Sequence, residues 1–490
     1  MRLEIEGSSA EGPEDIFAYA GPCRPVYSTV EEADGRVVLG TSHEPVMLQG
    51  PVHVPDAEGG RWPADNGGEG FTRKDGPVDF RREACRTRIR EVHELAEALE
   101  GEGMPRCAPV AEAVSQANAA LEAGDTDQAV ERAFRAGERL VEAETEWRLQ
   151  GATQLDPGIN TKGLHSARAA WDEHFAGRFN YATVPLTWGV LEAEKDRPRY
   201  DVLDDLVAWG REHGIRMKGH ALIWHSGFEK RCWMPDVSFE ELKQRSAARV
   251  RTILERIGDD LDAVELINEP VQAASLDLSV EQQLEETETV SRICRQMAPH
   301  IRQMISLYSE DESWFPRAFR NGREGLITVA EFIERCIERG VEPDLIGLQL
   351  HMPENLFHTR QVLEYWHRRF KVPVHVTEWT PPSGAEPSVR MDGRPMEPYL
   401  KTWRGRRWTE EVQAEHVRSF LRMYRALPFV ENATFWATTD APILWDDYLI
   451  GTVCEDYRLP WAAGQGLLRE DLTPKSVLNA IDEAMGRTNA

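Results

Sequence analysis

The chain has few cysteines for its length, and they follow no recognisable pattern. Seven cysteines are spread over 490 residues, and no Cys-x-x-Cys pair occurs. Such spacing excludes a disulfide framework and a zinc ribbon. We therefore expect reduced thiols with mostly structural roles, as is usual for cytoplasmic proteins.

Long apolar runs are also lacking. No stretch approaches the roughly 18 apolar residues of a membrane-spanning helix. The first residues, MRLEIEGSSAEGPEDIF, contain no apolar core of signal-peptide length. These absences predict a cytoplasmic protein that has no membrane partner.

Positive charge is scarce, and lysine is especially rare. The chain has 83 acidic and 57 basic residues and a formal charge of −26, and only 9 of the basic residues are lysines. Binding to nucleic acid depends largely on Lys and Arg, so the balance argues against a nucleic-acid partner. An acidic, lysine-poor surface is compatible with adaptation to salt, and equally with a GC-rich genome that favours arginine codons.

Composition divides the chain into three parts. Residues 1–80 are rich in Gly, Pro and Asp with short apolar runs, which predicts a small β-rich accessory domain. Residues 81–146 have helical spacing of Ala, Leu and Glu broken by glycines, which predicts a helical connector. Residues 147–490 alternate between short apolar runs and helix-like segments.

This alternation predicts a (β/α)8 TIM barrel. Eight apolar runs are candidate strands, near 150–155, 179–184, 215–224, 262–267, 304–308, 345–351, 373–378 and 432–438. A doubly wound open sheet is the alternative. It is disfavoured because no Gly-x-Gly-x-x-Gly or Walker loop follows any of the runs.

Polar and aromatic residues gather where the predicted strands end, which is where barrels carry their active sites. Two carboxylates at one mouth suit glycoside hydrolysis, in which one donates a proton and the other attacks the anomeric carbon or activates water. Trp faces stack on sugars, and imidazoles bind hydroxyls or tune carboxylates. The residues expected there are His220, Trp224, His225, Asn268, Glu269, Gln349, His351, Glu378, Trp436 and Trp445.

Five ordered motifs, GHALIWHS (219–226), ELINEP (265–270), IGLQLH (346–351), VTEW (376–379) and FWATTD…W (435–445), resemble those of glycoside hydrolase family 10, the xylanase family. The resemblance implies a retaining enzyme that needs no cofactor or metal and acts on a carbohydrate. It assigns Glu269 as acid/base and Glu378 as nucleophile. The other residues named above, together with Trp188, would then bind substrate.

The sequence also departs from the family pattern. On the second strand, the usual Glu, Asn and Lys positions hold Thr183, Val184 and Thr187. Loss of that lysine removes a charge-assisted hydrogen bond of about 1.5–3 kcal/mol, so affinity for plain xylan should fall. Two residues after the nucleophile, Thr380 replaces the Asp that normally holds the neighbouring His, which leaves the charge state of His351 open.

Residues 380–408 form a long Pro- and Gly-rich segment at the predicted catalytic face. Its aromatic residues are either sugar platforms or packing residues. Its arginines either receive a uronic-acid carboxylate or pair with nearby glutamates such as Glu410 and Glu411. The residues concerned are Tyr399, Trp403, Trp408, Arg404, Arg406 and Arg407.

Two other functions stay open at this stage. A metal-dependent barrel hydrolase would use His220, His225, His351 and the two glutamates as ligands. A non-catalytic carbohydrate-binding barrel would explain the lost second-strand contacts. For residues 1–80, a carbohydrate-binding module and a structural cap on the barrel are both considered.

Overall fold

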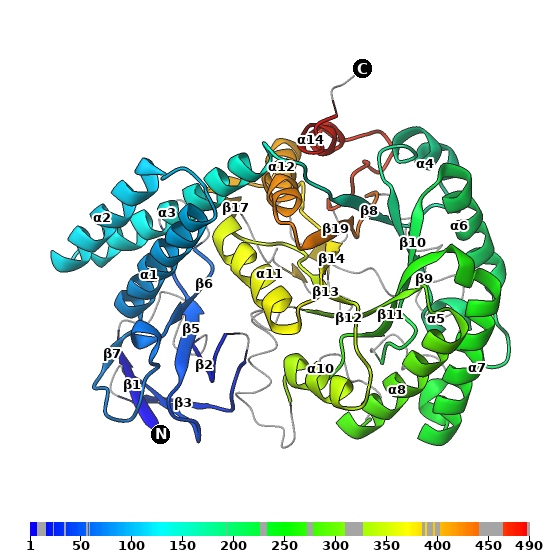
Figure 1. Cartoon of the computed structure of the whole chain (residues 1–490), viewed down its shortest axis with the longest axis horizontal. Helices are drawn as coiled ribbons and strands as arrows, with labels where there is room; N and C mark the ends of the chain where they lie inside the picture. The colour runs from blue at the N-terminus through cyan, green and yellow to red at the C-terminus, as the bar shows by residue number, and fades with distance from the viewer. Residues whose placement is uncertain are drawn as a thin grey trace.

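The computed structural model describes residues 1–6, 16–22, 24–33, 36–54, 57, 59–192, 194–225, 233–271, 278–308, 327–384, 388–389, 395–396, 402–440 and 464–487. Eight parallel strands close a barrel in the order β10-β11-β12-β13-β14-β19-β8-β9 (Figure 1). The predicted TIM barrel is therefore confirmed, and the open-sheet alternative is wrong. The strands are β8 (Asp156–Asn160), β9 (Tyr181–Pro185), β10 (Arg216–His220), β11 (Leu261–Asn268), β12 (Arg302–Tyr308), β13 (Leu345–Gln349), β14 (Val374–Trp379) and β19 (Val430–Phe435).

Helices surround the barrel, and polar caps mark where several begin. The side chains of Ser238, Ser279, Thr328, Asn355 and Thr409 each accept a hydrogen bond from a backbone N–H in the first turn that follows. None of the helices described is long and apolar enough to cross a membrane. The helices are α4 (Arg168–His174), α5 (Trp188–Leu191), α6 (Tyr200–His213), α7 (Phe239–Ile257), α8 (Val280–Met297), α10 (Val329–Glu338), α11 (Leu356–Phe370), α12 (Glu410–Ala426) and α14 (Val477–Ala484).

The first barrel strand lies later in the chain than predicted. The apolar run near 150–155 precedes β8, whose sequence is DPGIN. At its centre, a Cβ on Gly158 would lie 2.5 Å from Thr434 Oγ1 and 2.8 Å from Asn432 Nδ2. Close approach of β19 thus requires a glycine here, and the strand carries no apolar run that a periodicity search detects.

We expect Gly158→Val to destabilise the barrel, because the added side chain would overlap β19. The free energy of unfolding should fall by about 1–3 kcal/mol, the usual cost of overpacking. Urea unfolding followed by circular dichroism would measure it. Gly76→Val is the matched control, since a Cβ at Gly76 has nothing within 4 Å. Equal unfolding midpoints for the two variants would contradict this account of β8.

The N-terminal strands form two small sheets that share one hydrophobic core with the helices after them. Strands β1 (Arg2–Glu6), β3 (Thr29–Ala33), β4 (Arg36–Gly40) and β7 (Val78–Asp79) form one sheet, and β2 (Phe17–Tyr19), β5 (Met47–Pro51) and β6 (Arg61–Ala64) form the other. The helices are α1 (Phe80–Gly101), α2 (Ala108–Glu122) and α3 (Thr126–Arg148). Figure 1 shows this part, in blue and cyan, beside the barrel. The division into 1–80, 81–146 and 147–490 stays a prediction; in the structure α1 begins at Phe80 and α3 ends at Arg148.

Side chains from both parts interlock where this region meets the barrel. The buried Arg88 guanidinium of α1 lies 4.2 Å from the ring centre of Trp62 and 4.7 Å from that of Phe357 on α11. Glu144 of α3 forms a buried ion pair with Arg360 of α11. A cation between two aromatic faces and a buried ion pair are both geometrically specific contacts, so the packing supports a structural role for the N-terminal region.

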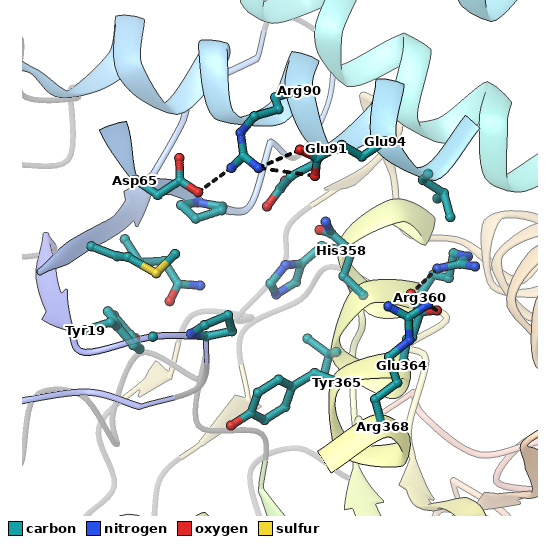
Figure 2. A pocket seen from close by; sticks show the side chains of 18 of the residues that line it. Tyr19, Asp65, Arg90, Glu91, Glu94, His358, Arg360, Glu364, Tyr365 and Arg368 are labelled. Carbon is teal, nitrogen blue, oxygen red and sulfur yellow. Dashed lines mark hydrogen bonds and ion pairs between the residues drawn. The ribbon is translucent and has the colours of Figure 1, made fainter. Parts of the chain in front are cut away.

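A cavity of about 680 Å³ lies at the same junction, between β2, β5, α1 and α11 (Figure 2). Much of its charge is internally paired. Arg90 binds Asp65 and Glu94, and Arg360 binds Glu364 at 2.6 Å. Neither of the two predicted catalytic glutamates lines it. The cavity is thus separate from the strand ends that carry the predicted chemistry.

Candidate active site

Glu269 follows β11 directly and is almost completely buried, with 8% of its surface exposed. Three N–H donors reach its carboxylate: Trp224 Nε1 at 3.1 Å, Gln349 Nε2 at 3.0 Å and Asn268 Nδ2 at 3.3 Å. Burial raises the pKa of Glu269 to about 7, against the effect of these hydrogen bonds. A carboxyl that keeps its proton near neutral pH is suited to act as a general acid.

Glu378 lies on β14 and is also buried, opposite Gln349 in the β13–β14 register. Burial and the neighbouring carboxylates of Glu269 and Glu265 raise the pKa of Glu378, while Lys162 and Lys218 act in the opposite direction. Glu269 is thus close enough to Glu378 to disfavour a negative charge on it. Such a pair is expected to share a proton, with cations deciding which member is ionised.

His351, after β13, is the histidine beside Glu378. Its Nε2 lies 3.4 Å from Glu378 Oε2, and its Nδ1 lies 3.3 Å from Thr380 Oγ1. Burial and the charge of Lys162 lower the pKa of His351 to about 3. The question raised by Thr380 is therefore answered: a hydroxyl replaces the carboxylate, and the imidazole is neutral at physiological pH.

A buried ionic layer lies beside the two glutamates, and sequence reasoning missed two of its members. Glu265 of β11 contacts Lys218 of β10 and lies 2.6 Å from His220 Nδ1. His220 and Lys218 hold the pKa of Glu265 at about 2 despite its burial. A detectable signal existed, because Lys218 and His220 are two residues apart and therefore point to the same side of a strand.

Lys162 is the third residue that sequence reasoning missed. It follows β8, and its backbone is fixed by hydrogen bonds from Thr438 Oγ1 to its carbonyl and from its N–H to Asn160 Oδ1, both 2.9 Å long. Its Nζ lies 4.0 Å from the ring centre of Trp436. Burial lowers the pKa of Lys162 to about 7, and Glu378 opposes this shift. Its strand was predicted several residues too early, so the lysine was not recognised at a strand end.

Trp224 and Trp436 are half-buried beside the glutamates and remain candidate sugar platforms. The ring centre of His220 lies 4.8 Å from that of Trp436 and 6.2 Å from that of Trp224. The structure thus brings together the predicted residues His220, Trp224, Asn268, Glu269, Gln349, His351, Glu378 and Trp436. Trp445 lies outside the described residues.

Two predicted site residues have protein partners outside this group. Trp188 is buried in a separate cluster, 5.0 Å from Trp233 ring to ring and 4.1 Å from the Arg249 guanidinium. His225 Nε2 binds Glu286 of α8 at 2.9 Å. Both side chains are satisfied by protein partners, so their assignment as substrate-binding residues has no support from these contacts.

The second-strand departures are buried and carry no charge. Thr183, Val184 and Thr187 are each at most 3% exposed, at the end of β9 and just after it. Thr183 accepts a hydrogen bond through its backbone carbonyl from Thr161 Oγ1, at 2.9 Å. These positions therefore supply none of the charged contacts that the family places there.

The segment 380–408 packs onto the barrel through its tryptophans. Its described part contains two short hairpins, β15 (Ser388–Val389) with β16 (Pro395–Met396), and β17 (Thr402–Trp403) with β18 (Arg406–Arg407). Trp403 and Trp408 are buried, with ring centres 5.1 and 5.3 Å from that of His416 on α12. They are packing residues, which settles the alternative left open. Tyr399 lies outside the described residues.

Two arginines of this segment bind glutamates other than Glu410 and Glu411. Arg404 binds Glu142 of α3 at 2.7 Å and Glu138 at 3.2 Å. Arg406 binds Glu415 of α12. These pairs favour the salt-bridge alternative over a receptor for uronic acids. In the part of the chain that the structure describes, no cluster of three or more His, Cys, Asp or Glu side chains is arranged to hold a metal ion.

Comparison with known proteins identifies the family of the barrel. Residues 159–465 match the family model Glycosyl hydrolase family 10. Endo-1,4-beta-xylanase 3 of Hypocrea jecorina is 26% identical over 223 residues, which are 42% of this chain and 61% of that protein. Endo-1,4-beta-xylanase/feruloyl esterase of Xylanibacter ruminicola is 23% identical over 299 residues, 54% of this chain and 38% of that protein.

Among solved structures, native xylanase 10B from Thermotoga maritima is similar with a TM-score of 0.48 and 20% identity, covering 70% of this chain and 97% of that one. The match covers 61% of the length of the Hypocrea jecorina relative and 38% of the length of the Xylanibacter ruminicola relative, which is less than two thirds of either protein.

Proposed function

We propose that this chain, which belongs to glycosyl hydrolase family 10, is a retaining glycoside hydrolase that cleaves β-linked xylan-type or related glycans. One observation carries the proposal. Two buried glutamates, Glu269 and Glu378, lie at the ends of β11 and β14 of one closed barrel, and the charge of Glu269 raises the pKa of Glu378. The names of the curated relatives support a xylan-type substrate.

In the first step, a Glu378 oxygen forms a bond with the anomeric carbon as the bond to the leaving oxygen breaks. Glu269 gives its proton to that oxygen, and a glycosyl–enzyme ester results. In the second step, Glu269 takes a proton from water, the water oxygen bonds to the anomeric carbon, and Glu378 leaves. The donors on Glu269 from Trp224 and Gln349 position it for both transfers. Retention predicts a carboxyl separation of about 5–5.5 Å.

The substrate is expected to differ from plain xylan. The second-strand positions Thr183, Val184 and Thr187 offer no charged group to a sugar on the non-reducing side. Decorated xylo-oligosaccharides or another β-linked glycan are therefore proposed beside plain xylan. A cytoplasmic location is also proposed, and it is compatible with the four cysteines of the described residues, which form no disulfide. There, the substrates would be oligosaccharides taken up by the cell.

A hydrolysis screen tests the proposal. The panel contains plain, arabinose-substituted and glucuronic-acid-substituted xylo-oligosaccharides, with cello- and manno-oligosaccharides for comparison. We expect turnover of at least one xylan-type compound, with the β-anomer as the first product seen by proton NMR. An α-anomer would contradict retention, and loss of activity after exhaustive chelation would favour the metal-dependent alternative. Absence of turnover on every compound would favour the non-catalytic one.

A further inference from the structure

Lys162 is a buried cation inside the candidate active site, and no contact of the proposed reaction uses it. It is 5% exposed, although lysine is almost never buried without a reason. It is also one of only 9 lysines in a chain with 57 basic residues. Its ammonium group lies against one face of Trp436, 4.0 Å from the ring centre, which is a cation–π geometry.

We propose that Lys162 is a positioning residue that supplies the positive charge needed for Glu378 to be ionised beside Glu269. The inference rests on the proposed glycosidase function. Lys162 acts through Glu378 and through the ring of Trp436, and no contact of its own with the sugar is needed.

Among the charged groups that the structure describes around Glu378, Lys162 is the one that can supply this positive charge. Two acidic groups, Glu269 and Glu265, disfavour a negative charge on Glu378. Lys218 is in direct contact with Glu265, so its charge is largely used there. Burial and the charge of Lys162 lower the pKa of His351 to about 3, so its imidazole is neutral. His220 is bound to Glu265, whose Oε2 lies 2.6 Å from its Nδ1. The facing groups are Lys218 and His220 on β10, Glu265 on β11, Glu269 just after β11, His351 after β13, and Glu378 on β14.

The lysine is also held rigidly, as a positioning role requires. Its backbone carbonyl accepts a hydrogen bond from Thr438 Oγ1, which ties the end of β8 to the segment after β19. Its N–H donates to the side chain of Asn160, the last residue of β8. The ring of Trp436 is in turn bounded by His220 at 4.8 Å between ring centres. The backbone N–H of Trp436 donates to the carbonyl of Trp379, the residue after Glu378, at 2.9 Å. The ammonium group and the ring are therefore tied to the strand that carries the nucleophile.

The pH dependence of kcat/KM separates this role from a merely structural one. Removing the positive charge raises the pKa of Glu378, so the acidic limb of the profile in Lys162→Met should move upward by about one pH unit or more. Lys162→Arg keeps the charge and should keep the acidic limb of the wild type. Lys162→Gln is a second neutral variant that should behave as the Met variant does. Lys243→Met, which removes a surface lysine bound to Glu285, is the matched control.

Infrared spectroscopy provides a readout that does not depend on turnover. Near pH 6, the C=O stretch of protonated carboxylic acids should gain intensity in Lys162→Met relative to the wild type, and Glu378→Gln in that background should remove the gain. Unshifted acidic limbs and identical spectra in both neutral variants would overturn the proposal while leaving the glycosidase function intact. Absence of wild-type turnover would instead remove the glycosidase function, and with it the proposed role for Lys162, whatever the spectra show about the charge.

Discussion

Glu378→Ala is expected to lower kcat for an aryl β-xyloside by about 10⁵- to 10⁶-fold, the size of loss seen when a catalytic nucleophile is removed. The variant has no oxygen to form the glycosyl–enzyme bond, so the first step stops. The measurement is a stopped assay of aryl alcohol release over hours. Glu255→Ala, which removes an exposed glutamate on α7, should retain wild-type activity.

Azide distinguishes loss of the nucleophile from loss of the fold. Truncation to alanine leaves a space beside the anomeric carbon that a small anion can occupy. Azide should restore release of the aryl alcohol and give the α-glycosyl azide, because the anion attacks from the side that Glu378 occupied. Restored release with a β-configured azide, or activity near the wild-type level without azide, would assign the nucleophile to another residue.

Glu269→Gln is expected to give the second largest effect, and its size should depend on the leaving group. With an oligosaccharide, whose departing hydroxyl needs a proton, kcat/KM should fall by about 10²- to 10⁴-fold. With a nitrophenyl leaving group, the first step should be affected far less. Comparing the two substrates under single-turnover conditions measures the difference, and equal losses on both would argue against Glu269 as the acid.

The same variant should change the pH profile and the stability in a defined direction. Glu269 donates a proton, so wild-type kcat/KM should decrease as pH rises through about 7, the raised pKa of its carboxyl. That limb should be absent in the Gln variant. A pKa raised from 4.5 to about 7 means that stability is lost between these two pH values, by about 3 kcal/mol. Relative to the wild type, Glu269→Gln should therefore gain thermal stability at about pH 8 compared with about pH 4.

Most of the site could be predicted because most barrel strands contain an apolar run that is recognisable in the sequence. The strands β11 and β14 contain apolar runs, so Glu269 and Glu378 could be assigned to strand ends from spacing alone. The strand β8 could not be located in this way. Its close contact with Thr434 and Asn432 requires Gly158, and its sequence carries almost no apolar signal. An error of a few residues in that strand concealed Lys162.

Protein partners account for the predictions that lack support. In the sequence, Trp188 and His225 lie close to strand ends, as substrate-binding residues would. Nothing in the neighbouring sequence reveals that Trp188 contacts Arg249 or that His225 binds Glu286. Those partners come from α7 and α8, and only the packing of helices on the barrel brings them near. The reverse holds for Glu265, whose partners are two residues apart on the neighbouring strand and were available from alternation.

The stacking of Arg88 between Trp62 and Phe357 has a consequence for how such a chain can evolve. One ring belongs to the N-terminal sheets and the other to α11, which begins at Leu356, five residues after His351. Recombination that exchanged the first eighty residues for an unrelated domain would leave a buried guanidinium with half of its aromatic enclosure. The N-terminal region and the catalytic barrel are therefore expected to be inherited together, as a single unit of selection.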